Sequence, residues 1–143
     1  GTAGAFTYSL VSVQDASTST CSQAQTGNAV VTVNAYPTAD AGSGGDECDL
    51  DFVLQATSSV GTGVWTMTDG TGTAMFSPNT NDSNAVVTVT EYGTKEFTWT
   101  EVNGTCSDTA TIEVNFFEQP VTNAGTGGDE CDLDFVLNAV SGT

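Results

Sequence analysis

The sequence predicts an all-β protein built from tandem β-sandwich repeats of about 83 residues. The segment GGDECDLDFVL occurs twice, at residues 44–54 and 127–137, and its two cysteines, Cys48 and Cys131, lie 83 positions apart. Apolar and polar residues alternate with a period of two, which is typical of strands with one buried face. No segment has the 3.6-residue apolar period of an amphipathic helix. Repetition and alternation together therefore favour a series of all-β domains.

The first strand of the repeat is expected over residues 48–56. Leu50, Phe52 and Leu54 alternate there with polar residues, so we expect these three side chains to point into a core while the neighbouring carboxylates stay in solvent. Further strands are predicted where β-branched and aromatic residues gather, at residues 63–68, 75–78 and 84–92.

The last two strands of the repeat, residues 96–102 and 109–117, are predicted to form a hairpin. Asn103 and Gly104 stand between them, and this dipeptide is a strong signal for a tight hairpin turn. About seven short strands, with Trp65 on the third, indicate an immunoglobulin-like sandwich. A small closed barrel is the alternative.

The chain is out of phase with its own repeats. Residues 97–115 have a diverged counterpart at residues 6–34, and a proline follows each of them, Pro37 in one case and Pro120 in the other. We therefore expect the C-terminal strands of one repeat at residues 1–36, a complete repeat at 37–119 and the N-terminal strands of a third at 120–143. Two or three strands bury little core by themselves, so we expect the protein to continue at both ends.

Charge excludes several classes of partner. The sequence has 18 Asp and Glu, a single basic residue, Lys95, no His and a net charge of −17. Nucleic acids and anionic membrane surfaces are bound by clustered Lys and Arg, which this chain lacks. No run of about 20 apolar residues is present, so no membrane insertion is expected. The abundance of Thr, Ser, Gly and Val is typical of an extracellular β protein.

Catalysis is not expected. There is no His, no Ser stands in a nucleophile elbow, and Lys95 lies in a turn-like stretch, EYGTKEF. Asp49 and Asp51 could act as an acid and base pair. Their alternation on a strand instead indicates an exposed, solvated acidic face.

The acidic residues near the predicted repeat boundary have two interpretations. Calcium is bound by several oxygen ligands gathered from short loops, whereas a solvated acidic patch only raises solubility. The spacing does not match a known calcium loop, which favours solubilising charge, and no other cofactor is expected. The candidate calcium ligands are Asp40, Asp46, Glu47, Asp49 and Asp51.

The four cysteines are predicted to form disulfides between repeats. Cys21 and Cys106 occupy equivalent places in the late hairpin, as Cys48 and Cys131 do in the early segment. Without His or a C-x-x-C pair, zinc is improbable, and regular cysteines in an extracellular-looking chain indicate disulfides. A bond between Cys48 and Cys106 is the simplest pairing. In a sandwich, however, these positions lie about 20 Å apart at opposite ends, which favours pairing with the neighbouring repeats and no disulfide within this chain.

Three aromatic residues could form a platform that stacks on sugars: Trp65, Phe97 and Trp99. One large aromatic residue per strand at alternating positions is more often part of a core. We therefore expect both tryptophans to be buried.

Two stretches resemble repeats of a known class of proteins. The stretch at residues 61–89, GTGVWTMTDGTGTAMFSPNTNDSNAVVTV, and YGTKEFTWTEVNGTCS at 92–107 are similar to the immunoglobulin-like and PKD-like repeats of Bacteroidota surface proteins. FTYSLVSVQDASTSTCSQAQTGNAVVTVNAYPTA at 6–39 is similar to repeats of the giant SprB-like gliding-motility adhesins. This resemblance implies export by the type IX secretion system, an extracellular cell-surface filament and adhesion during gliding. The DTA motif at residues 108–110 matches an O-glycosylation pattern of this phylum, with Thr109 as the acceptor.

The expected function is therefore a structural stalk segment of a long adhesin. Its expected partners are adjacent repeats of the same chain, the type IX secretion and surface-anchoring machinery, and surface polysaccharide. The alternative is a module whose loops bind a carbohydrate or a protein.

Overall fold

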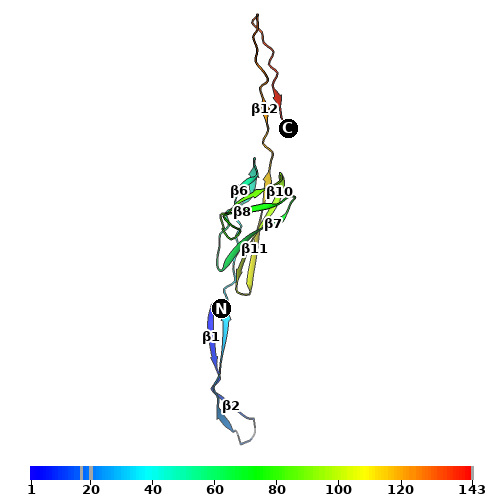
Figure 1. The fold of residues 1–143 in the computed structure, drawn as a ribbon. Helices are drawn as coiled ribbons and strands as arrows, with labels where there is room; N and C mark the ends of the chain where they lie inside the picture. The colour runs from blue at the N-terminus through cyan, green and yellow to red at the C-terminus, as the bar shows by residue number, and fades with distance from the viewer. Residues whose placement is uncertain (17, 20, 143) are drawn as a thin grey trace.

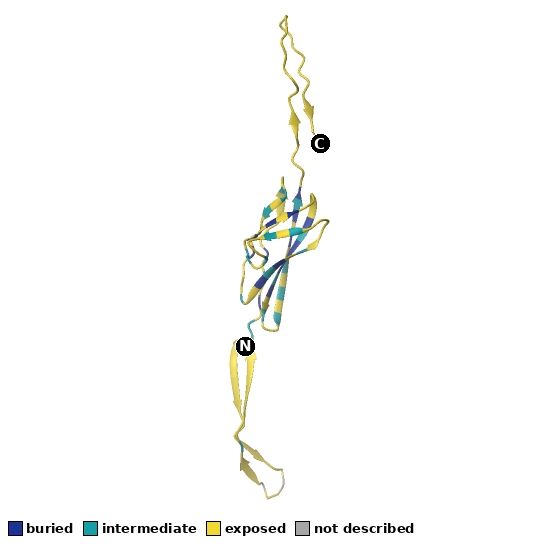
Figure 2. Ribbon diagram, viewed as in Figure 1, coloured by how far each residue is buried: buried dark blue, intermediate teal, exposed yellow. Residues whose placement is uncertain are grey.

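The computed structural model describes residues 1–16, 18–19 and 21–142 as an elongated molecule with three parts in a line (Figure 1). We call residues 1–36 the N-terminal arm, residues 37–119 the central unit and residues 120–143 the C-terminal arm. Buried residues lie in the central unit, while both arms are almost wholly exposed (Figure 2). No helix in the described part of the chain has the length and apolar character needed to cross a membrane.

The central unit is an immunoglobulin-like β-sandwich, as predicted. One sheet has four strands in the order β5-β11-β10-β7, and the other has three in the order β6-β9-β8. Because the two sheets are separate, the closed-barrel alternative is wrong. The seven strands are β5 (Gly45–Glu47), β6 (Asp51–Val53), β7 (Thr62–Asp69), β8 (Ala74–Ser77), β9 (Val86–Val89), β10 (Gly93–Asn103) and β11 (Cys106–Phe116).

The predicted hairpin is the longest element of the sandwich. β10 and β11 pair antiparallel along their whole length, from Gly93 opposite Phe116 to Asn103 opposite Cys106. The turn between them begins with Gly104 at φ +64°, a left-handed conformation that glycine adopts without strain. The Asn-Gly prediction is therefore confirmed.

Alternate residues of the strands fill the core. Trp65 and Trp99 are fully buried with ring centroids 5.3 Å apart, and Phe97 makes edge contacts with the rings of Phe76 and Phe116. Each such side chain contributes about 1.5 to 3 kcal/mol by its removal from water. Among the described residues, the buried apolar side chains lie between positions 41 and 116: Ala41, Leu54, Ala56, Trp65, Ala85, Val87, Val89, Phe97, Trp99, Ile112, Val114 and Phe116. The central unit thus has a core of its own.

The single early strand predicted over residues 48–56 is wrong in extent, although its inward-facing residues are right. Leu54 is buried and both Leu50 and Phe52 pack against the core. Residues 45–47 already form β5, which pairs parallel with β11, and the chain then bends at residues 48–50 before β6 joins the other sheet. The Asp49 carboxylate accepts a hydrogen bond from the Asp51 amide at 2.9 Å, which favours this bend.

The expectation that Lys95 stands in a turn is also wrong. β10 begins at Gly93, whose φ is +110°, so Lys95 is already the third residue of the strand. The side chain is only 1% exposed, because its stem packs against Gly70. Its ammonium donates hydrogen bonds to the carbonyl oxygen of Tyr92 at 3.2 Å and to the hydroxyl of Thr71 at 3.5 Å.

The N-terminal arm repeats the register of the β10–β11 hairpin. Phe6 lies opposite Val31 and Tyr8 opposite Ala29, just as Phe97 lies opposite Ile112 and Trp99 opposite Ala110. These equivalent side chains differ in burial: Phe6 is 41% and Tyr8 63% exposed, whereas Phe97 and Trp99 are both fully buried. The strands of this arm are β1 (Gly4–Ser9), β2 (Ser12–Gln14), β3 (Ser22–Ala24) and β4 (Asn28–Val33).

The C-terminal arm repeats the first part of the central unit. Its strands, β12 (Thr122–Asn123) and β13 (Val140–Ser141), pair at Asn123 and Val140, which are 83 positions after the isolated bridge between Asp40 and Thr57. The side chain of Asn123 accepts a hydrogen bond from the amide of Gly125, as Asp40 does from Gly42. Apolar side chains equivalent to core residues are exposed here too, namely Leu133, Phe135 and Leu137.

Candidate functional site

The segment that enters the central unit lies against the tip of the β10–β11 hairpin. The side-chain amide of Asn103 donates a hydrogen bond to the carbonyl oxygen of Ala35 at 2.9 Å. Gly104 approaches the side chain of Asn34 so closely that a Cβ atom there would clash with it. We call residues 34–39 the linker. The linker, together with the side chains that hold it, is the joint.

Two further hydrogen bonds fix the linker at Thr38 and Ala39. The Asp108 carboxylate accepts a hydrogen bond from the amide of Ala39 at 2.9 Å, and the Ser59 hydroxyl oxygen accepts one from the amide of Thr38 at 2.8 Å. Between these residues Pro37 is buried, and its ring fixes φ. The linker is thus bound along its length rather than free in solvent.

The buried side chain of Glu101 fixes Ser59 by two hydrogen bonds. Its side chain is fully buried, and its two carboxylate oxygens accept hydrogen bonds from the Ser59 amide at 2.7 Å and the Ser59 hydroxyl at 2.6 Å. Since the hydroxyl proton points to Glu101, the oxygen of Ser59 remains an acceptor for the amide of Thr38. A buried carboxylate thus orients the group that binds the linker.

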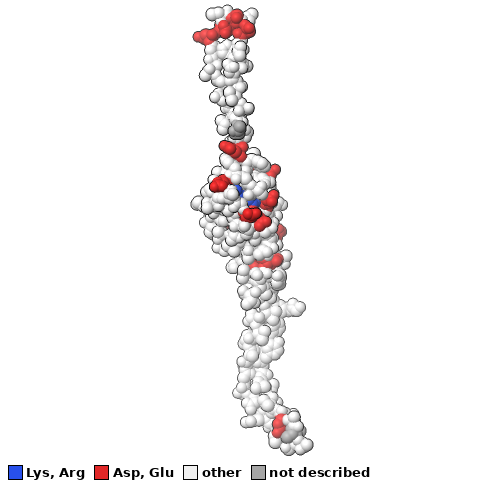
Figure 3. All heavy atoms as spheres, turned by 90° about the vertical axis from the view of Figure 1, so that its right-hand side faces the viewer, with Lys and Arg blue, Asp and Glu red and all other residues white. Residues whose placement is uncertain are grey.

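The joint depends little on attraction between charges. Figure 3 shows acidic side chains on the central unit and at the far end of the C-terminal arm, with a long stretch of the N-terminal arm free of them. Asp15 is the only acidic residue among the first 36. The donors that contact the linker, or that the linker supplies, are all amide groups. Such bonds are less sensitive to salt than surface ion pairs are.

The cysteines lie at opposite ends of the central unit. Cys106 begins β11 beside the joint, whereas Cys48 follows Glu47, which pairs with Phe116 at the other end of β11. Cys106 and Phe116 are ten positions apart on one extended strand, which is about 33 Å. A disulfide needs Cα atoms within about 7 Å, so Cys48 and Cys106 of the same unit cannot bond. The structure describes all four cysteines and joins none of them to another, and three of them are exposed.

The acidic candidates for calcium binding do not converge. Among the described residues, no group of three or more acidic, His or Cys side chains is arranged to hold a metal ion. Each of these carboxylates instead accepts a hydrogen bond from a protein group. The donors are the amide of Gly42 to Asp40, the side chain of Asn115 to Asp46, the amide of Cys48 to Glu47, the amide of Asp51 to Asp49 and the hydroxyl of Thr88 to Asp51. Calcium binding by this set stays a prediction.

The prediction that both tryptophans are core residues is confirmed, and the alternative of a sugar-stacking platform is wrong, because Trp65, Phe97 and Trp99 are all fully buried. A ring must be exposed to stack on a ligand, so these side chains stabilise the fold instead. Thr109, the predicted glycosylation acceptor, is exposed near the start of β11, between residues 108 and 110, which are half-buried.

Sequence reasoning missed the joint. Asn103 was interpretable only as part of a turn and Asp108 only as part of the DTA motif, because their partners, Ala35 and Ala39, lie 68 and 69 positions away. The available signal was the repeated proline after the late hairpin, which marks a fixed linker without naming what binds it.

Comparisons with known proteins give a likeness of fold alone. No protein-family model matches the chain, and no curated protein matches it. The chain is similar to the solution structure of the PKD domain from KIAA 1837 protein, with 22% sequence identity and a TM-score of 0.49. The match covers 69% of this chain and 100% of that domain. Fold does not determine function, so the function rests on the residues of this chain.

Proposed function

We propose that this chain is a structural segment of a stalk, in which tandem sandwiches are joined end to end to give an extracellular protein reach. The single observation that supports this proposal best is the bound linker at residues 34–39. A free linker lets two domains move independently. A linker that the next domain binds through Asn103, Asp108 and Ser59 holds them in line.

The internal repetition supports the same proposal. The N-terminal arm has the register of the last hairpin, and the C-terminal arm has the pairing of the first segment. Each arm also carries the apolar face that a complete sandwich buries. In a repeat array each unit contacts only its neighbours, so length grows with the number of copies.

The finer assignment rests on the resemblance to repeats of the giant gliding-motility adhesins. On that basis the chain belongs to a cell-surface filament exported by the type IX secretion system, anchored at the surface and able to contact polysaccharide, and Thr109 carries a glycan. Labelling of intact cells with an antibody against residues 37–119 tests the location. Intact-mass measurement of the native protein tests the modification. Labelling only after the cells are permeabilised would contradict the surface assignment.

Backbone relaxation of the linker tests the stalk itself. In the unmodified chain, the amides of Thr38 and Ala39 should be as rigid as the central unit, with order parameters of about 0.85. Asp108→Ala removes the acceptor for the Ala39 amide and should lower its order parameter, whereas the neighbouring Thr109→Ala is the matched control and should leave it unchanged. Order parameters below about 0.6 in the unmodified chain would contradict the proposal. Specific binding of this chain on a glycan array would instead favour a ligand-binding module.

A further inference from the structure

The hairpin cysteine lies beside the linker that comes from the preceding repeat. Cys106 is the ladder partner of Asn103, and such partners have Cα atoms about 5 Å apart. The side chain of Asn103 in turn binds the carbonyl oxygen of Ala35 at 2.9 Å. Cys106 is therefore within reach of whatever lies next to Ala35 and Tyr36.

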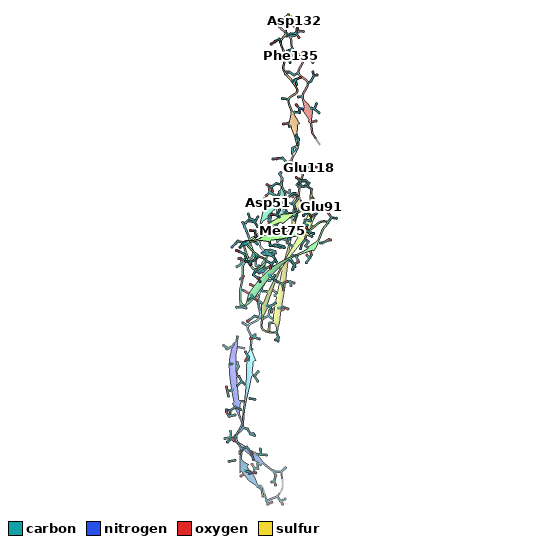
Figure 4. The ribbon with its side chains drawn as sticks, viewed as in Figure 1. Asp51, Met75, Glu91, Glu118, Asp132 and Phe135 are labelled. Carbon is teal, nitrogen blue, oxygen red and sulfur yellow. The ribbon has the colours of Figure 1, made fainter. Side chains whose placement is uncertain are left out.

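The other type of cysteine lies beside the equivalent residues at the far end of the central unit. The amide of Phe117 donates a hydrogen bond to the carbonyl oxygen of Glu47 at 2.8 Å, and Cys48 is the next residue along the chain. Cys48 is exposed at this point. Figure 4 shows Glu118 where the chain leaves the central unit, with Asp51 in the same half of the sandwich.

The shared register connects these two places. Gly4 opposite Val33 corresponds to Lys95 opposite Val114, so Ala35 takes the position of Phe116 and Tyr36 that of Phe117. In a complete preceding repeat, a strand like β5 would pair with the end of β4. Its cysteine would then lie beside Tyr36, as Cys48 lies beside Phe117.

The asparagine before Ala35 gives a second point of convergence. In the central unit the Asn115 side chain donates a hydrogen bond to the Asp46 carboxylate at 3.0 Å. Asn34 is the equivalent residue, and it contacts Gly104 of the hairpin tip. The segment that carries Cys48 in one repeat and the hairpin that carries Cys106 in the next therefore meet at the same asparagine.

We propose that a disulfide crosses each joint and links a Cys48-type cysteine to the Cys106-type cysteine of the following repeat. The two thiols lose two protons and two electrons as the S–S bond forms, and a small-molecule or protein disulfide accepts them and is released as two thiols. One cysteine at each end of every repeat gives a series of covalent links, so tension on the filament cannot separate neighbouring sandwiches. The inference rests on one part of the proposed function, namely that the repeats follow one another end to end.

The test completes the sandwich that the N-terminal arm begins. A copy of residues 37–94 is placed directly before Gly4, which takes the position of Lys95, and the rest of the chain is kept. We call this the two-repeat chain. In it Cys21→Ser, Cys48→Ser and Cys131→Ser leave only the added copy of the Cys48-type cysteine and Cys106. The matched control is the 143-residue chain with Cys21→Ser and Cys131→Ser, which retains Cys48 and Cys106.

Both chains are incubated with oxidised glutathione, and their intact masses are measured by mass spectrometry. The two-repeat chain should lose two hydrogens through an internal disulfide, and it should do so faster in native buffer than in urea. The control should instead gain glutathione adducts. Adducts in place of a disulfide in the two-repeat chain, no advantage of native buffer over urea, or an internal disulfide in the control would each overturn the proposal.

The failure of the disulfide can be told apart from the failure of the stalk. Small-angle scattering of the reduced two-repeat chain reports its shape without any cross-link. If the particle is extended and well defined but its thiols do not form a disulfide, the disulfide proposal is contradicted and the stalk proposal is not. If the two sandwiches have no fixed arrangement, the stalk proposal is contradicted as well.

Discussion

Trp65 and Trp99 pack against each other in the core but differ in their hydrogen bonding. The ring nitrogen of Trp65 donates to the carbonyl oxygen of Ser83 at 3.3 Å. The ring nitrogen of Trp99 is buried and finds no acceptor among the residues that the structure describes. An unpaired buried donor lowers stability, whereas a paired one does not.

We predict that Trp99→Phe destabilises the protein less than Trp65→Phe does, by about 1 kcal/mol in the free energy of unfolding. Both changes remove similar apolar area, but only Trp65→Phe also leaves the Ser83 carbonyl without its donor. Urea unfolding followed by circular dichroism measures the difference. An equal or larger loss for Trp99→Phe would show that its ring nitrogen does have a partner.

Glu101 makes a second residue-level prediction. Glu101→Ala leaves the amide and hydroxyl of Ser59 without an acceptor and should lower the free energy of unfolding by about 3 kcal/mol. Glu101→Gln keeps the shape and one acceptor oxygen, so its loss should be smaller. If Glu101→Ala unfolds at the same urea concentration as the unmodified chain, the buried carboxylate does not support the joint.

At the scale of elements, the tip of the β10–β11 hairpin has two roles, as a turn and as the surface that receives the linker. Gly104→Ala should lower the free energy of unfolding by about 1 to 2 kcal/mol, because φ is positive there. It should also release residues 34–39, since the new Cβ clashes with Asn34. Unfolding curves measure the first effect and amide relaxation of Ala35 the second.

Gly93→Ala is the matched control for this prediction. Gly93 also has a positive φ, but it lies at the opposite end of β10 from the hairpin tip, and the nearest atom to a Cβ there would be the Lys95 ammonium nitrogen at 3.8 Å. It should therefore destabilise the protein without changing the relaxation of Ala35. Equal effects of the two substitutions on the linker would contradict a specific contact between Gly104 and Asn34.

Elements with local signals were predicted well from the sequence, and elements that depend on distant partners were not. Alternating apolar residues and the Asn103–Gly104 turn identify β10, β11 and the core tryptophans. The strand β5 has no such signal, because it is defined by parallel pairing with residues about 70 positions later. The burial of Lys95 was missed for the same reason. Its side chain is covered by Gly70 and Thr71, which belong to the connection between β7 and β8.

At the scale of the whole molecule, two causes could produce an extended shape: bound linkers or repulsion between acidic residues. The net charge is −17, and much of it lies outside the N-terminal arm. Repulsion between exposed charges is screened within about 3 Å at 1 M salt. Hydrogen bonds between amides and the groups of the joint are affected far less.

We therefore predict that the radius of gyration of the chain, measured by small-angle scattering, stays the same when sodium chloride is raised from about 0.05 M to about 1 M. A chain held straight by bound linkers keeps its shape in high salt. A marked decrease would show that charge repulsion, not the joint, extends the molecule.

The central claim, that a bound linker holds consecutive sandwiches in line, is tested most directly by a distance distribution across the joint. Val30 and Thr111 are equivalent, exposed positions on β4 and β11. Nitroxide labels at Val30→Cys and Thr111→Cys, in the two-repeat chain with its native-type cysteines changed to Ser, report this distance by double electron–electron resonance. A bound linker predicts one narrow peak at about 35 to 45 Å, the length of one repeat. A broad distribution like that of two domains on a free linker would contradict the claim.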